Sequence, residues 1–210
     1  MKEKLLPPTR EEIALFPLFQ GLTLEHICLP VGPEALEAAL QDLLSSPFVG
    51  FDTESKPVFR KDQPSKGPHV VQLCTASTGY IFQLHDQAAY PVICQVLQAK
   101  QVVKVGFGLQ SDRSHIRRKF GVEITAILDL DAVYRKLGYR RQLGVKAAIA
   151  VQFGQKFNKS KRVSTSNWAL PTLSDAQLLY AANDAYAALK ILQGLQQAGD
   201  GKIIKEQILM

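Results

Sequence analysis

The stretch LSDAQLLYAANDAYAAL, residues 173–189, predicts the helix around which the rest of the chain is organised. Ser174 is a favourable N-cap residue, and Gln177, three residues later, completes a capping box. Alanine and leucine are strong helix formers, and no Gly or Pro interrupts them before Gly194. Apolar residues recur at helical spacing and indicate a buried stripe: Leu178, Ala181, Ala182, Ala185, Leu189 and Leu192.

Tyr180 and Asp184 add a polar pair to this helix. They are four residues apart, so the phenol and the carboxylate share one helix face. An isolated buried carboxylate is very unfavourable, so an acid on this face must pair with a positive group or hold a cation. The alternative is an exposed Asp beside an ordinary core Tyr, and the helix alone does not decide between the two.

The whole chain has the composition of a globular protein, with 210 residues, 46% of them hydrophobic and 21% charged. Lys and Arg number 25 against 19 Asp and Glu, and the resulting net charge of +6 permits a polyanionic partner without requiring one. Three widely spaced cysteines predict buried thiols rather than disulfides or a zinc site. The sequence has no signal-peptide core or membrane span, so we expect a cytoplasmic protein without a membrane partner.

A second acidic site follows a predicted strand. Residues 48–55 read FVGFDTES, and the apolar start is typical of a strand buried on both faces. Asp52 and Glu54 are two residues apart, so they project to the same side of that strand. Adjacent carboxylates repel unless a positive charge lies between them, and a divalent cation meets that need. A solvated strand end is the alternative.

A third acid, Asp112, opens a helix after the predicted strand at 101–107. The turn Gly106-Phe107-Gly108 resembles a dinucleotide-binding loop, but Ser111 occupies the third glycine position and no phosphate-loop lysine follows. We therefore expect a strand-to-helix turn that places Asp112 in the first helical turn, where the helix dipole favours a carboxylate.

Two further segments are ambiguous. Asp129 and Asp131, at the end of another strand, form a competing acid pair, although one of them could cap the next helix. The basic segment 156–162 could follow a phosphate backbone or could be an ordinary solvated loop.

The predicted elements follow the order β-α-β-β-β-α-β-α-β-α-α-α, in which the second to fourth strands form an antiparallel meander. This order predicts a mixed sheet flanked by helices. Oxygen donors suit Mg²⁺ or Mn²⁺, whereas zinc favours His or Cys. Four such donors come together in this reading: Asp52, Glu54, Asp112 and Asp184.

The acidic segments resemble the Exo I, Exo II and Exo III motifs of the DEDD 3′–5′ exonucleases. The motifs correspond to FDTE at 51–54, VGFGLQSD at 105–112 and YAAND at 180–184. The Tyr-x-x-x-Asp spacing marks the tyrosine subclass, because Leu179 stands where the histidine subclass has its His. The similarity spans residues 25–195 and is strongest to the Werner syndrome exonuclease and ribonuclease D group, partly through SNW at 166–168.

The resemblance implies an α/β, ribonuclease H-like fold with a mixed sheet of five to six strands and helices on both faces. It divides the chain into an N-terminal extension at 1–23, a 3′–5′ exonuclease domain at 24–198 and a short C-terminal tail at 199–210. It also implies a metal-dependent enzyme that hydrolyses terminal phosphodiesters of DNA or RNA and releases nucleoside 5′-monophosphates.

The same resemblance implies roles for individual residues. Asp52 would bridge two ions, Mg²⁺ or Mn²⁺, while Glu54 and Asp184 complete the first and Asp112 holds the second. Tyr180 would orient the attacking water. Weaker candidates contact the nucleic acid: Lys161, Arg162, Ser166 and Trp168, of which Trp168 has core packing as its alternative.

The expected substrate is a nucleic acid with a free 3′ end, with DNA slightly favoured over RNA. The chain has no counterpart to the second binding domain of ribonuclease D, so we expect this domain or a partner to hold the substrate.

Two alternatives are a catalytically silent nucleic-acid-binding module and a phosphodiesterase for very short oligonucleotides. A silent module would have no need to retain buried, mutually repelling acids. The oligomeric state is left open.

Overall fold

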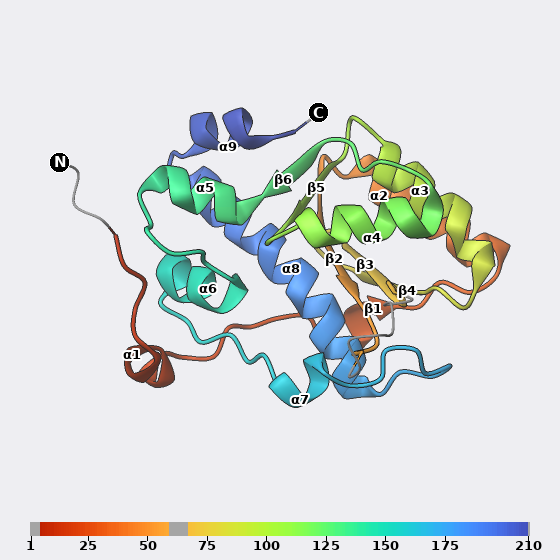
Figure 1. The fold of residues 1–210 in the computed structure, drawn as a ribbon, viewed down its shortest axis with the longest axis horizontal. Coiled ribbons are helices and arrows are strands. Elements are labelled where there is room, and N and C mark those ends of the chain that lie inside the picture. The colour runs from red at the N-terminus through yellow and green to blue at the C-terminus, as the bar shows by residue number, and fades with distance from the viewer. Residues whose placement is uncertain (1–4, 59–66, 210) are drawn as a thin grey trace.

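The computed structural model describes residues 5–58 and 67–209 and shows one mixed sheet with the strand order β1-β4-β3-β2-β5-β6 (Figure 1). Its strands are β1 (Ile27–Cys28), β2 (Phe48–Glu54), β3 (Val70–Cys74), β4 (Gly79–Gln83), β5 (Val103–Gly106) and β6 (Ile127–Asp129). Its helices are α1 (Arg10–Leu15), α2 (Pro33–Ser45), α3 (Tyr90–Gln98), α4 (Gln110–Phe120), α5 (Leu130–Leu137), α6 (Val145–Phe153), α7 (Lys161–Ser164), α8 (Asp175–Gln197) and α9 (Gly201–Gln207).

The pairing of the strands confirms the predicted mixed sheet. Strands β2, β3 and β4 form the antiparallel meander. Strand β5 adds to β2 in parallel, β6 adds to β5 in parallel, and β1 adds to β4 in parallel. Parallel neighbours need crossover connections, and α2, α3 and α4, which lie within these connections, cover one face of the sheet. Helix α8, which follows the last strand, covers the other face, so helices flank the sheet on both sides as the ribonuclease H-like prediction requires. The acids of β2 and the turn after β5 therefore come to the same part of the sheet.

Helix α8 lies along one face of the sheet and is the longest element in Figure 1. The small stripe residues Ala181, Ala182 and Ala185 pack with Val70 and Cys74 of β3. On the opposite face, apolar side chains of α2, α3 and α4 pack with the other side of β2 and β3. Each strand alternates its side chains between these two layers.

Gly50 of β2 allows α8 to approach the sheet closely. A Cβ atom at this position would lie 2.0 Å from the carbonyl oxygen of Ala185, a distance that no side chain tolerates. Gly106 of β5 serves a similar purpose, since a Cβ there would lie 2.5 Å from the carbonyl oxygen of Phe51. Both contacts lie beside the acids of β2, so the glycines set how closely α8 and β5 approach them.

Several details differ from the sequence prediction. Gly194 does not end α8, which continues to Gln197. Gln152 of α6 packs against Gly194, where a larger residue would not fit without a shift. The segment around Lys161 forms a single helical turn, α7, instead of a plain loop, and residues 201–207 of the expected tail form α9.

Two isolated β-bridges help to attach the N-terminal segment to the body of the protein. Leu5 forms an isolated parallel bridge with Tyr139, and Leu18 forms another with Lys156. Within residues 5–58 and 67–209, every helix is too short or too polar to cross a membrane.

Candidate active site

Three of the predicted acids meet between the sheet and α8. Asp52 and Glu54 project from the end of β2 toward α8, and Asp184 faces them from the helix. One carboxylate oxygen of each lies within 4.8 Å of the others, and this is the single such acidic group in the described part of the chain. The sequence placed the two β2 acids on one side, and the fold adds the third.

Asp112 lies beside this group and is joined to it through Thr53. The Thr53 hydroxyl donates a hydrogen bond of 2.5 Å to Oδ1 of Asp112, and Thr53 stands between the two β2 acids. Asp112 is buried in the first turn of α4, as the sequence predicted. It is thus a neighbour of the three-acid group rather than a member of it.

Asp129 and Asp131 do not form the competing metal pair, because backbone amides occupy their carboxylates. Asp129 accepts hydrogen bonds of 3.0 Å from the amides of both Gly108 and Leu109, and it also caps α5. Asp131 is buried and accepts from the amide of Leu143 at 2.9 Å. Asp129 therefore fixes the turn that starts α4 and positions Asp112.

Withdrawal from water and mutual repulsion both favour the protonated forms of these acids. Burial, followed by the charges of Asp112 and Asp184, holds the pKa of Asp52 well above its ordinary value. Burial and the Asp52 charge raise the pKa of Glu54 to about 9. Burial likewise raises the pKa values of Asp112 and Asp184. Such a cluster is unfavourable when ionised, unless cations neutralise it.

Tyr180 lies one helical turn before Asp184 and is 8% exposed. Burial, with a contribution from the Asp184 carboxylate, raises the pKa of Tyr180 to about 12, so the phenol stays protonated at neutral pH. The Trp168 ring packs against the Tyr180 ring, with 5.8 Å between their centroids. Tyr180 can therefore donate a hydrogen bond from a fixed position but is not poised to act as a base.

Lys159 is a site residue that the sequence did not single out. Its ammonium forms an ion pair with Oδ2 of Asp184 and lies 5.1 Å from the centroid of the Tyr180 ring. Burial alone would lower the pKa of Lys159, but the carboxylates of Asp184 and Asp52 raise it above the ordinary lysine value. The signal available in the sequence was its basic segment, which pointed toward phosphate and not toward the acids.

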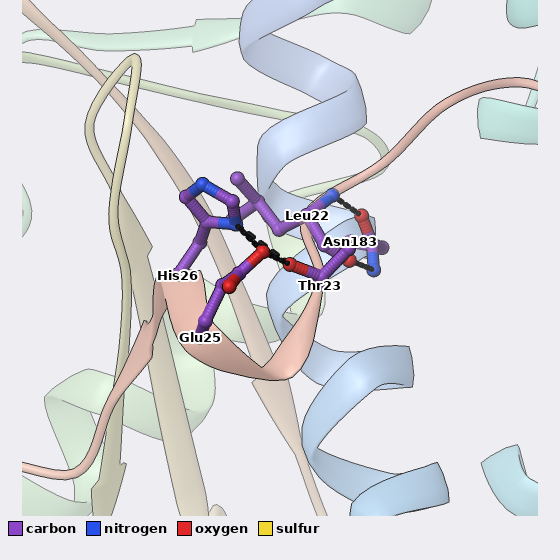
Figure 2. Close-up of polar contacts among 5 residues, drawn as sticks. All are labelled: Leu22, Thr23, Glu25, His26 and Asn183. Carbon is purple, nitrogen blue, oxygen red and sulfur yellow. Dashed lines mark hydrogen bonds and ion pairs between the residues drawn. The ribbon is translucent and has the colours of Figure 1, made fainter.

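Asn183, next to Asp184, holds the N-terminal segment against α8 (Figure 2). Its Oδ1 accepts from the amide of Leu22 at 2.7 Å, and its Nδ2 donates to the Leu22 carbonyl at 3.1 Å. Thr23 then donates to Glu25 at 2.9 Å and contacts His26 at 2.8 Å. A cavity of about 320 Å³ lies beside Tyr180 and Asp184, between this segment, the loop before α7 and α8.

The four weaker candidates have different surroundings. Lys161 and Arg162 are exposed on α7 and are free to meet a phosphate backbone. The Ser166 hydroxyl accepts a hydrogen bond of 3.0 Å from Gln177. Trp168 is 1% exposed and donates to the Ser164 carbonyl, so the structure places it in the core, where it supports Tyr180 and cannot stack on a base.

The residues fit a divalent cation site on two observations. The donor set consists of carboxylate oxygens, which hard cations prefer. Among the described residues, neither oxygen of Asp184 has a hydrogen-bond donor at good geometry, although the Lys159 ammonium is in ion-pair contact with Oδ2. Oδ1 thus has neither a hydrogen bond nor an ion pair among those residues, and a buried carboxylate oxygen in that state is costly and marks a place for a cation.

A sequence profile of 3′–5′ exonucleases matches residues 31–200. The chain belongs to this family. Over 155 residues it is 32% identical to the bifunctional 3′–5′ exonuclease/ATP-dependent helicase WRN of Mus musculus, an alignment that covers 72% of this chain and 11% of that protein. The chain therefore corresponds to only a small part of this relative's length.

Solved structures share the fold. The Nibbler EXO domain of Aedes aegypti superimposes with a TM-score of 0.73 at 21% identity, covering 90% of this chain and 99% of that one. Trypanosoma brucei RNase D in complex with RNA U12 superimposes with a TM-score of 0.70 at 18% identity, covering 88% and 64% of the two chains. These likenesses confirm the ribonuclease H-like fold class.

Proposed function

We propose that this protein removes nucleotides from the 3′ end of a nucleic acid by hydrolysing the terminal phosphodiester bond and releasing nucleoside 5′-monophosphates. The observation that carries the proposal is the meeting of Asp52, Glu54 and Asp184 within 4.8 Å, with Tyr180 one turn away on α8. A binding module would gain nothing from acids that repel one another and resist ionisation. Membership of the 3′–5′ exonuclease family supports the same activity.

Asp52, Glu54 and Asp184 would hold one divalent cation, and Asp112 would help to hold a second, each Mg²⁺ or Mn²⁺. Bound cations of this kind supply an activated water and neutralise charge on the phosphate. The protein residues would do the rest of the positioning. The protonated phenol of Tyr180 would donate a hydrogen bond that orients the water, and Trp168 would keep its ring in place.

The nucleic acid would approach along the exposed basic residues Lys161 and Arg162. Each phosphate neutralised by a lysine or arginine adds affinity that falls with salt. The predicted slight preference for DNA over RNA has no support in the comparisons, and the Trypanosoma brucei RNase D structure contains RNA. Both polymers belong in the test. The cytoplasmic location and the boundaries at 23 and 198 likewise stay predictions.

End-labelled single strands of DNA and RNA provide the test, incubated with Mn²⁺, with Mg²⁺ or with EDTA. We expect a ladder of products shortened from the 3′ end, present with either metal and abolished by EDTA. Asp52→Ala should reduce activity to background, whereas Asp175→Ala, which removes an exposed acid at the start of α8, should retain it. Metal-independent activity, or full activity of Asp52→Ala, would contradict the proposal.

Product length separates the remaining alternatives. Cleavage restricted to oligonucleotides of a few residues would indicate a phosphodiesterase for very short substrates. Metal-stimulated binding without products from any of the substrates would indicate a silent binding module. Comparing single strands with recessed duplex ends in the same panel identifies the preferred substrate.

A further inference from the structure

Lys159 places a positive charge inside a group of metal-ligating acids, where a metalloenzyme has no evident need for one. Its ammonium contacts Oδ2 of Asp184, whose side chain is 3% exposed, while the side chain of Lys159 itself is 30% exposed. The lysine therefore reaches inward from a partly open position to the most buried acid of the group.

We infer that Lys159 is a displaceable counter-ion, which neutralises Asp184 in the metal-free protein and leaves the cluster when divalent cations bind. The inference rests on the proposed function, because it presumes that the acids bind metal. It adds a residue that sets how tightly they do so.

Charge balance supports the exchange. Four carboxylates, those of Asp52, Glu54, Asp112 and Asp184, carry four negative charges when ionised, and two divalent cations balance them. The Lys159 ammonium would then be a surplus positive charge within a few ångströms of the metals, in a region where water screens charges poorly. Without metal, the same ammonium is the nearest available compensation for Asp184, whose oxygens have no hydrogen-bond donor at good geometry in the described chain.

The surrounding structure allows the side chain to move without moving the loop. The loop is anchored on the N-terminal segment, where the Phe19 amide donates to the Lys156 carbonyl at 3.0 Å and the Lys156 amide donates to the Pro17 carbonyl at 2.8 Å. Phe157 is buried and packs against Phe19 with 5.8 Å between ring centroids. Lys159 follows this anchor, so rotation about its own side-chain bonds is enough to release Asp184.

The first test measures metal affinity by calorimetric titration of Mn²⁺ into metal-free protein. Removing a competing charge should tighten binding, and we expect Lys159→Met to lower the Kd by about tenfold or more, consistent with the strength of charge interactions at partly buried sites. Lys161→Met removes the same charge from an exposed position on α7 and should leave the Kd within about twofold, as is usual for a screened surface charge. An unchanged or weaker affinity of Lys159→Met would overturn the inference.

The second test uses the wild-type chain and does not depend on how the variant folds. Lysine acetylation by acetic anhydride, read by mass spectrometry, should find Lys159 protected in EDTA and several-fold more reactive with saturating Mn²⁺. Lys161 should react equally in both conditions and serves as the internal control. Equal reactivity of Lys159 with and without Mn²⁺ would refute the exchange. Absence of Mn²⁺ binding to the wild-type chain would instead refute the proposed function itself.

Discussion

Substituting Gly50 with alanine tests whether the close approach of β2 and α8 assembles the site. The new Cβ would lie 2.0 Å from the Ala185 carbonyl oxygen, whereas real Cβ contacts stay above 3.0 Å, so strand and helix must separate by about 1 Å. The three nearest atoms all belong to the backbone of Ala185, so no side-chain rotation relieves the clash. Asp52 is two residues from Gly50 and Asp184 is next to Ala185, so the shift falls on the two walls of the site.

The expected cost has two parts. Overpacking a tight core contact costs about 2 kcal/mol, which lowers the melting temperature of a chain of this size by about 4–8 °C. A misplacement of about 1 Å in a catalytic site lowers kcat/KM by about 10²-fold. Activity should therefore fall much further than stability, and Mn²⁺ affinity should fall with it.

Thermal denaturation, nuclease kinetics and Mn²⁺ titration of Gly50→Ala measure these effects on the same preparation. Gly201→Ala is the matched control, since a Cβ at Gly201 meets no atom within 4 Å. A Gly50→Ala protein with wild-type kcat/KM and metal affinity would show that the α8–β2 distance does not set the geometry of the acids.

Three further predictions concern individual groups. Tyr180→Phe should lower kcat by about 10²-fold, as expected for a lost orienting contact, with Mn²⁺ affinity unchanged in a titration; weaker metal binding would contradict the orienting role. Asp129→Ala leaves three amides, those of Gly108, Leu109 and Asp131, without their acceptor and should cost about 1–3 kcal/mol in urea unfolding, with activity reduced through Asp112; unaltered stability would refute its structural role. The pKa of Glu54 is about 9 in the folded protein against 4.5 in the unfolded chain, so the folded state binds its proton more tightly. Stability of the metal-free protein should therefore fall as pH rises between those values, and a melting temperature in EDTA that stays flat or rises across that range would contradict the raised pKa of Glu54.

Periodicity and the spacing of acids were sufficient to predict the main elements and the sheet class. The meander of β2, β3 and β4 and the start of α8 at its capping box are local patterns, and the structure confirms them. Strand alternation was sufficient to place Asp52 and Glu54 on one side of β2, and the structure brings Asp184 to them. The sequence analysis also grouped Asp112 with these acids, whereas the structure places it beside them, hydrogen-bonded to Thr53.

Long-range contacts were beyond the reach of sequence patterns. Trp168 is buried in part because its ring packs against Tyr180, and that contact is a property of the assembled fold. Lys104 shows a second limit within a short segment: it lies fully buried in β5, and its ammonium donates to the carbonyls of Ala99 and Val102, which precede it closely in the chain. Nothing in the residues around it indicates that these acceptors would be available.

The contact between Asn183 and Leu22 has a consequence for local opening of the N-terminal segment. The amide and the carbonyl of Leu22 both form hydrogen bonds with the Asn183 side chain of α8, within a segment that is otherwise largely exposed. Amide hydrogens in such segments normally exchange with solvent almost freely, whereas those of packed helices exchange only on larger openings. The rate of deuterium uptake at the Leu22 amide would therefore report how often the N-terminal segment detaches from α8, the helix that carries Asp184.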